Sequence, residues 1–520
     1  MTSFAFKFDH QNPPPGVFTG ADLYRPTTLH CDVVVVGSGA GGSTAAAELA
    51  EAGYDVIVLE EGGYYGTNDF NAKASEMIRT LYRDGGATMA MGNPPVFYQE
   101  GSTVGGSTVV NGGMSWRTPE KILTRWSKDD QLRDILPEDM EPFFERVERR
   151  IHVRHQDPES IGRDNALLKL GADAKKWEVI PNLRNQAHCT GSNNCAFGCP
   201  TGAKQSALIT YIPRALHFGA RVYANVRVKQ ITFKGTRATG VTGNVVNPNG
   251  TLGSPITVHA GLVISACGAI HTPALLHRSK YRSQSKLLGG NLSLHPNGKL
   301  IAVFDEDIRG WEGVHQAFQV REFQDEGFLF AAVNVPPGII AMGMHQYGEG
   351  LGEVMSDYPR MLIAGMLLED TALGRVRMDP LGNPNTFYQL NDFDAERLIR
   401  GTALLCELIF EAGARKIFIP FGSGGELTSP DDIPKLFEEK ISKDSLELFT
   451  VHMMGTAKMG AAPQSAVTND FGHVFGAEQL VLCDASLFPS PIGVNPAETI
   501  HALSTRNVAH LLENHTKYLR

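Results

Sequence analysis

The amino-acid sequence predicts an α/β protein with two domains. One domain is Rossmann-like and built on a parallel sheet, and the second is an α+β domain built on an antiparallel sheet. The first follows from residues 33–42, where four valines run directly into a glycine-rich turn. The second follows from residues 299–335, where longer alternating segments replace short buried strands and helices. A chain of 520 residues also exceeds the size of about 250–300 residues at which one hydrophobic core stops growing.

The glycine-rich turn has a specific spacing. Gly37, Gly39 and Gly42 fit G-x-G-x-x-G between the valines of residues 33–36 and the Ala-rich residues 43–50. Four β-branched residues suit a strand buried on both faces, and the alanines favour a helix. The first glycine makes the tight turn, the second lets a pyrophosphate approach the backbone, and the third packs helix against strand. This context predicts a Rossmann-like unit rather than a chance turn.

An acidic residue completes this unit. Residues 56–59 form the next apolar strand, and Glu60 follows them directly. A carboxylate at this place is typical of the group that binds the ribose hydroxyl of an adenosine. The sequence therefore predicts a bound dinucleotide.

Composition limits the function classes. Hydrophobic residues make up 42% and charged residues 20% of the chain, as in ordinary globular proteins. The formal net charge is −9 and the chain has no Lys/Arg-rich run, which argues against nucleic acid as a partner. No apolar run reaches membrane-spanning length, and residues 1–7 lack the apolar core of a signal peptide. We therefore expect a cytoplasmic protein without a transmembrane segment.

The rest of the first 300 residues reads as an alternation of helices and strands. Residues 101–113 are glycine-rich and uncharged, which favours backbone lying flat against a planar or charged group. Charge-rich residues 119–180 predict helices. A helix over 208–218 ends at a glycine, and strands follow at 221–228 and 262–264.

The segment after residue 300 predicts the antiparallel sheet, with strands at 299–305 and 328–335. Residues 328–333, 339–344 and 361–368 are rich in Phe, Met, Ile and Leu. Most such runs form only core, whereas a minority line an adaptable apolar pocket.

Three motifs near the C-terminus contain polar residues that are candidates for catalysis or cofactor binding. Residues 451–460 contain His452, and residues 480–489 contain Asp484 and Ala485. Asn495, Pro496 and Thr499 then open a helix.

With these residues the chain resembles the glucose–methanol–choline (GMC) oxidoreductase family, whose members bind FAD. The resemblance covers nearly the whole chain. It includes the dinucleotide fingerprint, the block at residues 105–108 with Asn111, residues 269–273 as a second signature and the loop at residues 289–296.

The resemblance implies His452 and Asn495 as the catalytic pair that faces the flavin. A histidine takes up a proton near neutral pH, and an amide donates a hydrogen bond without titrating. His473 and His501 are expected to be structural residues, and residues 295–296 are expected to form a turn. The positions that the resemblance assigns to FAD contacts are Gly37, Gly39, Gly41, Gly42, Glu60, Gly105, Gly106, Ser107, Thr108, Asn111, Val228, Asp484, Ala485, Pro496 and Thr499.

Cys189, Cys195 and Cys199 form a C-x5-C-x3-C-P block that suits an iron–sulfur cluster. The block is similar to that of bacterial FAD-dependent sugar dehydrogenases, which use three such cysteines for a 3Fe–4S cluster and pass electrons to a haem partner protein. It also resembles long-chain alcohol oxidases, whose block ends like residues 202–205. A disulfide, or buried thiols that bind nothing, would also account for the three cysteines, and a zinc site lacks a fourth ligand beyond His188.

We therefore expect FAD-dependent oxidation of an alcohol CH–OH group to the carbonyl by hydride transfer to flavin N5, with His452 as general base. The apolar segments favour an apolar alcohol, and oxygen or another acceptor takes the electrons. Two rival functions are an iron–sulfur sugar or polyol dehydrogenase with a partner protein, and a non-redox lyase on the same fold. Asn495 counts against the lyase, since hydroxynitrile lyases resemble the subtype with two histidines.

The expected FAD-binding domain is discontinuous and takes residues 28–125, 181–300 and 441–520. Residues 126–180 and 301–440 form the expected substrate-binding domain, and residues 1–27 form an N-terminal arm.

Overall fold

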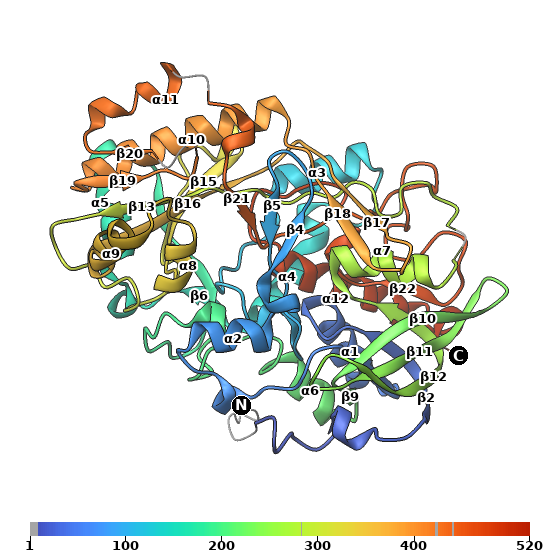
Figure 1. Cartoon of the computed structure of the whole chain (residues 1–520). Helices are drawn as coiled ribbons and strands as arrows, with labels where there is room; N and C mark the ends of the chain where they lie inside the picture. Colours follow the sequence, from blue (N-terminus) through green and yellow to red (C-terminus); the bar gives the residue numbers. More distant parts are fainter. Residues whose placement is uncertain (1–8, 282, 422–424, 439–440, 520) are drawn as a thin grey trace.

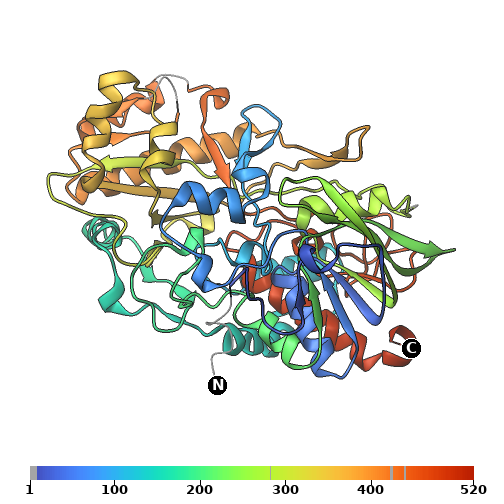
Figure 2. The same ribbon diagram turned by 60° about the horizontal axis from the view of Figure 1, so that its bottom comes forward.

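Two large sheets lie side by side in the computed structural model of the chain (Figure 1; Figure 2). The structure describes residues 9–281, 283–421, 425–438 and 441–519. Residues 1–8 of the expected N-terminal arm lie outside the described residues, and the arm continues into the short strand β1 (Val17–Phe18). The predicted α/β class and the second, antiparallel sheet are confirmed.

The large sheet has the strand order β1-β9-β3-β2-β12-β11-β10, and β22 also pairs with β12. The strands from β1 to β12 and β22 are parallel, whereas β12, β11 and β10 form an antiparallel meander. The bounds are β9 (Arg221–Tyr223), β3 (Val56–Leu59), β2 (Thr27–Val36), β12 (Leu252–Ser265), β11 (Arg237–Val246), β10 (Val226–Lys234) and β22 (Leu480–Leu482).

The register of the parallel strands determines where a ligand can lie. Val36 is level with Leu59 in β3 and with Ser265 in β12. The residues that follow these strands therefore meet at one carboxyl edge, the place where open parallel sheets bind ligands. All four valines of the motif are buried, as expected for a strand covered on both faces.

Helix α1 (Ala40–Glu51) covers one face of this sheet and packs against α6 (Tyr211–His217) and α12 (Ala497–Glu513). Its alanines let the neighbouring elements approach closely, and residues 41–50 are all buried. A short C-terminal segment of the chain is thus packed directly beside the N-terminal dinucleotide motif.

The second sheet is antiparallel throughout and has the order β20-β19-β13-β16-β15-β14-β7. Helices α5 (Arg163–Lys175) and α10 (Asp392–Glu411) cover one of its faces. The bounds are β20 (Glu426–Leu427), β19 (Lys416–Phe418), β13 (Lys299–Val303), β16 (Met361–Leu368), β15 (Phe328–Val333), β14 (Phe318–Val320) and β7 (Val179–Pro181).

Side chains alternate between the two faces of this sheet, as the strand period of two requires. The even-numbered residues of β13, β15 and β16 form a core with the covering helices. Most of the odd-numbered residues of the same strands line a cavity described below. The apolar runs predicted as core or as pocket lining therefore serve as both.

One local prediction differs from the structure. The strand expected at 221–228 breaks at Asn225, whose φ of 59° is left-handed, so that β9 and β10 take separate places in the sheet. The apolar run at residues 339–344 lies mostly in helix α8 (Pro337–Met342), which begins at Pro336 and Pro337, and it contributes to the lining of the cavity.

The remaining elements form short sheets and connecting helices. A small sheet of β21 (Leu448–Thr450), β5 (Val96–Tyr98) and β4 (Thr88–Ala90) lies beside the cavity. The others are α2 (Ala74–Leu81), α3 (Glu120–Asp129), α4 (Pro137–Ile151), β6 (Val153–His155), β8 (Leu183–Asn185), α7 (Gly268–Arg278), α9 (Gly348–Ser356), β17 (Arg375–Met378), β18 (Pro384–Phe387), α11 (Lys435–Glu438) and α13 (His515–Tyr518).

Residues 126–180 contact both parts of the molecule. Helix α4 packs against α12, whereas α5 packs on β15 and α10 of the second sheet. The division of the chain into domains stays a prediction. Among the described residues, none of the helices combines the length and apolar character needed to cross a membrane.

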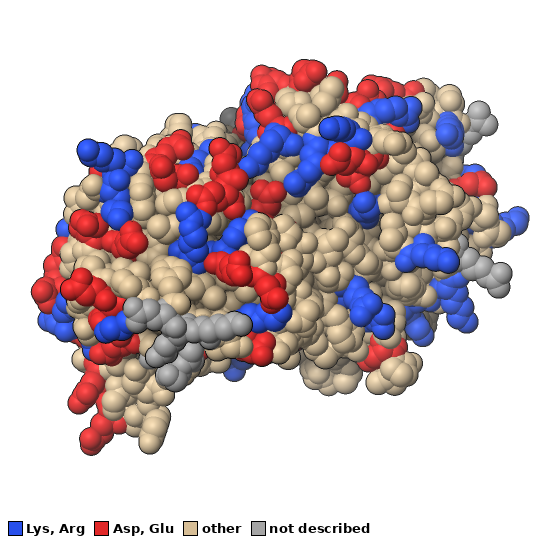
Figure 3. All heavy atoms as spheres, turned by 90° about the horizontal axis from the view of Figure 1, so that it is seen from above, with Lys and Arg blue, Asp and Glu red and all other residues tan. Residues whose placement is uncertain are grey.

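Acidic and basic side chains are interspersed on the face seen in Figure 3. A broad area without acidic or basic side chains lies between them. No stripe of one charge sign dominates this face.

Candidate active site

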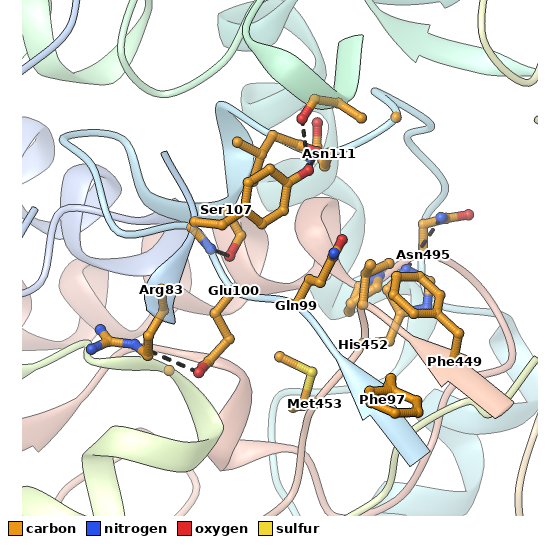
Figure 4. Close-up of a pocket in the computed structure, with 18 of the residues that line it drawn as sticks. Arg83, Phe97, Gln99, Glu100, Ser107, Asn111, Phe449, His452, Met453 and Asn495 are labelled. Atoms are coloured by element: carbon orange, nitrogen blue, oxygen red, sulfur yellow. Dashed lines mark hydrogen bonds and ion pairs between the residues drawn. The ribbon is translucent and has the colours of Figure 1, made fainter. Parts of the chain in front are cut away.

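One cavity of about 1130 Å³ lies between the carboxyl edge of the large sheet and the odd-numbered face of the second sheet. In Figure 4, His452 and Asn495 lie toward one side of this cavity, and Arg83 and Glu100 toward the other. The cavity therefore connects the dinucleotide motif with the C-terminal motifs.

Glycines shape the end of the cavity next to the large sheet. Gly37 has a φ of 97°, and a Cβ on it would lie 2.3 Å from the carbonyl oxygen of Ala266. A Cβ on Gly41 would lie 1.6 Å from the carbonyl oxygen of Cys483, so α1 packs directly on the end of β22. Gly39 faces the cavity, since a Cβ there would meet only the Cα of Gly106, at 3.9 Å. The N-terminus of α1 thus opens onto the cavity, where backbone N–H groups favour an anion.

Glu60 is buried at the end of β3 and lines the same cavity. Its Oε2 accepts hydrogen bonds from the backbone N–H of Ser38 (2.9 Å) and from Ser38 Oγ (2.7 Å), and its Oε1 accepts one from Gly62 N (2.9 Å). Burial raises the pKa of this carboxyl group, while these donors act against the rise. Since a carboxylate has roughly four acceptor positions, one remains for a ligand hydroxyl.

The second glycine-rich segment lies against the first one. A Cβ on Gly106 would lie 2.7 Å from Gly39 Cα, so the two backbones touch. Thr108 Oγ1 donates to Gly105 O (2.6 Å), which fixes the turn. Asn111 lines the cavity, and its Oδ1 is buried without a hydrogen-bond partner among the described residues. This oxygen is free to accept a hydrogen bond from a molecule bound in the cavity.

Asp484 joins the C-terminal motif to α7. Its Oδ2 accepts hydrogen bonds from Gly268 N (3.0 Å) and Thr272 Oγ1 (2.5 Å). Its Oδ1 accepts from Ser486 N (2.8 Å). Burial raises the pKa of Asp484. These contacts hold the turns before α7 and after β22 together at the cavity wall.

Most of the site residues predicted from the sequence line this one cavity. They are Gly37, Gly39, Gly41, Glu60, Gly106, Ser107, Thr108, Asn111, Val228, His452, Asp484, Ala485, Asn495 and Pro496. Gly42 and Gly105 support the turns behind it, and Thr499 forms a buried hydrogen bond with Thr118 (Oγ1 to Oγ1, 2.8 Å). The roles of all these residues stay predictions.

The predicted catalytic pair is in contact. His452 Nε2 and Asn495 Nδ2 are 3.4 Å apart, and both residues line the cavity. Burial lowers the pKa of His452 to about 4, so the imidazole is neutral at neutral pH. A neutral imidazole next to an amide provides one group that exchanges a proton and one that does not.

His295 contacts His452, and this contact was not predicted from the sequence. The predicted turn is present, since His295 has a left-handed φ of 45°. Its side chain is fully buried and its Nδ1 lies 3.3 Å from His452 Nδ1. The only signal in the sequence was a histidine in the loop at residues 289–296.

A charged cluster at the opposite side of the cavity was also not predicted. Arg83 Nη1 donates to Glu61 Oε1 (3.1 Å), and Arg83 Nε lies 3.7 Å from Glu100 Oε2. His271 Nε2 lies 3.4 Å from the same oxygen of Glu100. The positive charges of Arg83 and Arg227 lower the pKa of Glu61 to about 2 against its burial. The one sequence feature that could have indicated this cluster is the second acidic residue, Glu61, directly after the predicted ribose-binding Glu60.

Comparison with known proteins assigns the chain to a family. Two family models described as GMC oxidoreductase match residues 78–297 and 370–504, and a model described as FAD binding domain matches residues 32–78. An uncharacterized GMC-type oxidoreductase of Sinorhizobium fredii is 34% identical over 489 residues, which cover 94% of this chain and 95% of that protein. The chain belongs to the GMC oxidoreductase family.

Other similar proteins extend the comparison. A long-chain-alcohol oxidase of Arabidopsis thaliana is 28% identical over 541 residues, which cover 96% of this chain and 69% of that protein. The crystal structure of pyridoxine 4-oxidase from Mesorbium loti superposes with a TM-score of 0.69 at 16% identity. That match covers 93% of this chain and 99% of the other, and it shows a shared fold.

FAD is the cofactor of this GMC oxidoreductase, and the residues of the cavity fit it. The N-terminus of α1 with Gly39 would receive the pyrophosphate, and Glu60 would accept from the ribose. The unpaired Oδ1 of Asn111 and the touching backbones of Gly39 and Gly106 would lie along the cofactor.

The cysteine block does not fit an iron–sulfur cluster. Cys195 Sγ lies 3.5 Å from Arg184 Nη2, and Cys199 Sγ lies 3.5 Å from Lys204 N. Cys189 packs in an apolar group with Val314 and other side chains. All three cysteines are free. Across the described ranges, no group of three His, Cys, Asp or Glu side chains is arranged to hold a metal ion, so the predicted 3Fe–4S cluster is not supported.

Lys204 gives the cysteine block a different role. Its buried Nζ donates to the carbonyl oxygens of Val109 (2.7 Å), Asn111 (2.8 Å) and Cys195 (2.6 Å). All three protons of the ammonium group are thereby used. Lys204 ties the block to the glycine-rich segment that lines the cofactor cavity.

Proposed function

We propose that this FAD-dependent oxidoreductase oxidises an apolar alcohol to its carbonyl, with His452 and Asn495 acting on the substrate oxygen. FAD, when bound, accepts the hydride from the alcohol carbon. The observation that carries the proposal is the contact of His452 Nε2 with Asn495 Nδ2 inside the cavity that also contains the glycine cradle.

His452 would take up the hydroxyl proton of the alcohol. Its burial keeps the imidazole neutral at neutral pH, and a neutral imidazole is the form able to accept a proton. The amide of Asn495 would donate a hydrogen bond to the oxygen as negative charge develops there. Because Asn495 does not titrate, this donor is present at every pH.

The walls of the cavity support an apolar substrate. On the second sheet its lining is mostly apolar, with Leu329, Ala331 and Val333 from β15 and Ile363 from β16. The long-chain-alcohol oxidase of Arabidopsis thaliana, with 28% identity, is named for an apolar alcohol. That name also favours dioxygen as the electron acceptor.

The direct test is reduction of the flavin in the purified holoenzyme without oxygen. 1-Decanol and sorbitol are mixed with the protein in separate samples, and the flavin absorbance is followed. We expect 1-decanol to bleach the flavin bands, and admission of air to restore them. Bleaching by sorbitol alone would make the protein a polyol dehydrogenase, and no bleaching by any alcohol would contradict the proposed function.

A further inference from the structure

Lys299 places an ammonium group in the apolar part of the cavity. It lies in β13, and its side chain is on the odd-numbered face that lines the cavity. Its neighbours on this face are apolar, among them Ile301 in the same strand and Leu367 and Ile363 in β16. A charged group in such surroundings is unfavourable unless it has a partner.

The fold provides a place for this side chain but no anion. Lys299 Nζ lies 4.2 Å from the ring centroid of Phe449. Gly365 is level with Lys299 in the neighbouring strand, and a Cβ on it would lie 3.1 Å from Lys299 Cγ. In the described part of the chain, no carboxylate or hydrogen-bond acceptor contacts Lys299 Nζ.

The charged groups nearby do not neutralise Lys299. At the cavity mouth Glu447 pairs with His345 (2.9 Å), and Asp444 is exposed to solvent. His315 lines the cavity, and burial lowers its pKa to about 3, so it is uncharged. Burial alone lowers the pKa of Lys299 to about 8. Lys299 is therefore mostly protonated at neutral pH, and its charge is not compensated by the protein.

We propose that Lys299 binds a carboxylate of the substrate, so that the preferred alcohol is a hydroxy acid with an apolar chain between its hydroxyl and carboxylate. This inference rests on the proposed oxidation of an alcohol at His452. A monoanion matches the single charge of Lys299, whereas a dianionic phosphate would leave one charge uncompensated in an apolar site.

The place of Lys299 relative to His452 agrees with a substrate that contacts both. Phe449, which lies under the ammonium group, precedes His452 by three residues. Three extended residues span at most about 11 Å. The carboxylate and the reacting hydroxyl would therefore lie within one molecule of moderate length, along the apolar wall of the second sheet.

The test compares pairs of substrates that differ only in the carboxylate. We would measure kcat/KM for 6-hydroxyhexanoate and 10-hydroxydecanoate against 1-hexanol and 1-decanol. In Lys299→Met, the ratio of hydroxy acid to alkanol should fall by about 10- to 100-fold, as expected for loss of a charge-assisted hydrogen bond. Lys299→Arg should restore part of the ratio.

Lys416→Met is a matched control. Lys416 lies in the neighbouring strand β19, where its Nζ pairs with Glu426 (3.2 Å) and lies 5.5 Å from the ring centroid of Phe418. It does not line the cavity, so the substrate ratio should match that of the wild type. An unchanged ratio in Lys299→Met would overturn the proposed carboxylate site.

Binding of decanoate tests the site without turnover. We expect calorimetry on the holoenzyme to show decanoate binding that weakens above about pH 8, as Lys299 loses its proton, and that is at least 10-fold weaker in Lys299→Met. If decanoate binds in this way but no alcohol reduces the flavin, the proposed function fails and the anion site stands. If alkanols reduce the flavin but decanoate binds both proteins equally, the anion site fails alone.

Discussion

The imidazole rings of His295 and His452 meet at their Nδ1 atoms, which are 3.3 Å apart, with the ring planes 87° to one another. His295 Nε2 lies 3.2 Å from Ile492 N and 3.1 Å from Gly493 N, and it accepts hydrogen bonds from both backbone N–H groups. Because Nε2 is an acceptor, the proton of neutral His295 is on Nδ1. His295 Nδ1 therefore donates to His452 Nδ1, and the proton of neutral His452 lies on Nε2. Asn495 Nδ2, 3.4 Å from that Nε2, is then a contact and not a hydrogen-bond partner, since an amide N–H group does not accept a hydrogen bond.

This arrangement makes His295 a positioning residue for His452. Before His452 can accept a proton at Nε2, its own proton must move to Nδ1, which breaks the hydrogen bond from His295. The contact thus adds to burial in opposing the charged form of His452. Burial, together with any positive charge on His452, also lowers the pKa of His295 well below its usual range, so His295 stays neutral.

We predict that His295→Leu raises the pKa of His452 above its value of about 4, because it removes the donor at Nδ1 while the burial that lowers the pKa remains. The acid limb of the kcat/KM profile should move to higher pH by the same amount, because in the proposed mechanism only neutral His452 accepts the substrate proton. The measurement is kcat/KM against pH with 1-decanol. His295→Gln, which keeps one donor and one acceptor, should lie between the two profiles. Coinciding acid limbs in wild type and His295→Leu would remove His295 from this role.

We predict that His452→Ala slows flavin reduction by about 10²-fold or more, the usual size of a general acid–base contribution. Asn495→Ala should slow it by a comparable factor, since it removes one preorganised donor. Stopped-flow bleaching of the flavin without oxygen measures both, and the flavin absorbance per mole of protein, compared with that of the wild type, checks that FAD is retained. A near-normal rate with full FAD in His452→Ala would contradict the assignment.

The local motifs could be predicted from the sequence because they depend on neighbours in the chain. The spacing of Gly37, Gly39 and Gly42 between a strand and a helix led to the position of the cofactor site, and Glu60 followed from the next strand. The contact of His295 with His452 could not be predicted in this way, since 157 residues separate them and only tertiary packing brings them together.

Residue spacing alone cannot show whether side chains point to a common site, and the iron–sulfur prediction depended on spacing alone. Cys189, Cys195 and Cys199 have a spacing that suits a cluster, but Cys189 packs with apolar side chains while Cys195 contacts Arg184. Lys299 gave no signal, because a lysine in an alternating strand is normally solvated. Only the packing of β16 and Phe449 around Lys299 shows that its charge lies in apolar surroundings, which is the observation that indicates an anion site.

We predict that the purified protein contains flavin without stoichiometric iron or acid-labile sulfide. The reason is that the three cysteines have different contact partners, and no three His, Cys, Asp or Glu side chains in the described part of the chain are arranged to hold a metal ion. Iron and sulfide assays on protein purified without oxygen measure this directly. Cys199→Ser should leave the rate of flavin reduction within about two-fold, since its sulfur makes only weak hydrogen bonds, with Lys204 N and Thr201 Oγ1. Near-stoichiometric iron that is lost in Cys199→Ser would restore the iron–sulfur cluster.

The last prediction concerns Glu498, which is fully buried near the start of α12, two residues after Pro496 of the cavity wall. Burial raises the pKa of Glu498 well above its usual range, and the negative charge of Glu148 adds to this rise, whereas Arg117 acts against it. The folded protein therefore keeps a proton on Glu498 at pH values where the unfolded chain has released it. Folding stability should fall as pH rises from about 4.3 toward the folded pKa, by at most about 1.4 kcal/mol per pH unit.

Glu498→Gln keeps the shape and the hydrogen-bond donor of the protonated acid but cannot lose a proton. Its melting temperature should equal that of the wild type near pH 4 and exceed it increasingly as pH rises through neutrality, because only the wild type must keep Glu498 protonated. Thermal unfolding of both holoenzymes across this pH range measures the difference. Glu513→Gln, at the exposed end of the same helix, should show no such trend. A pH-independent difference between Glu498→Gln and wild type would show that Glu498 is ionised in the folded protein.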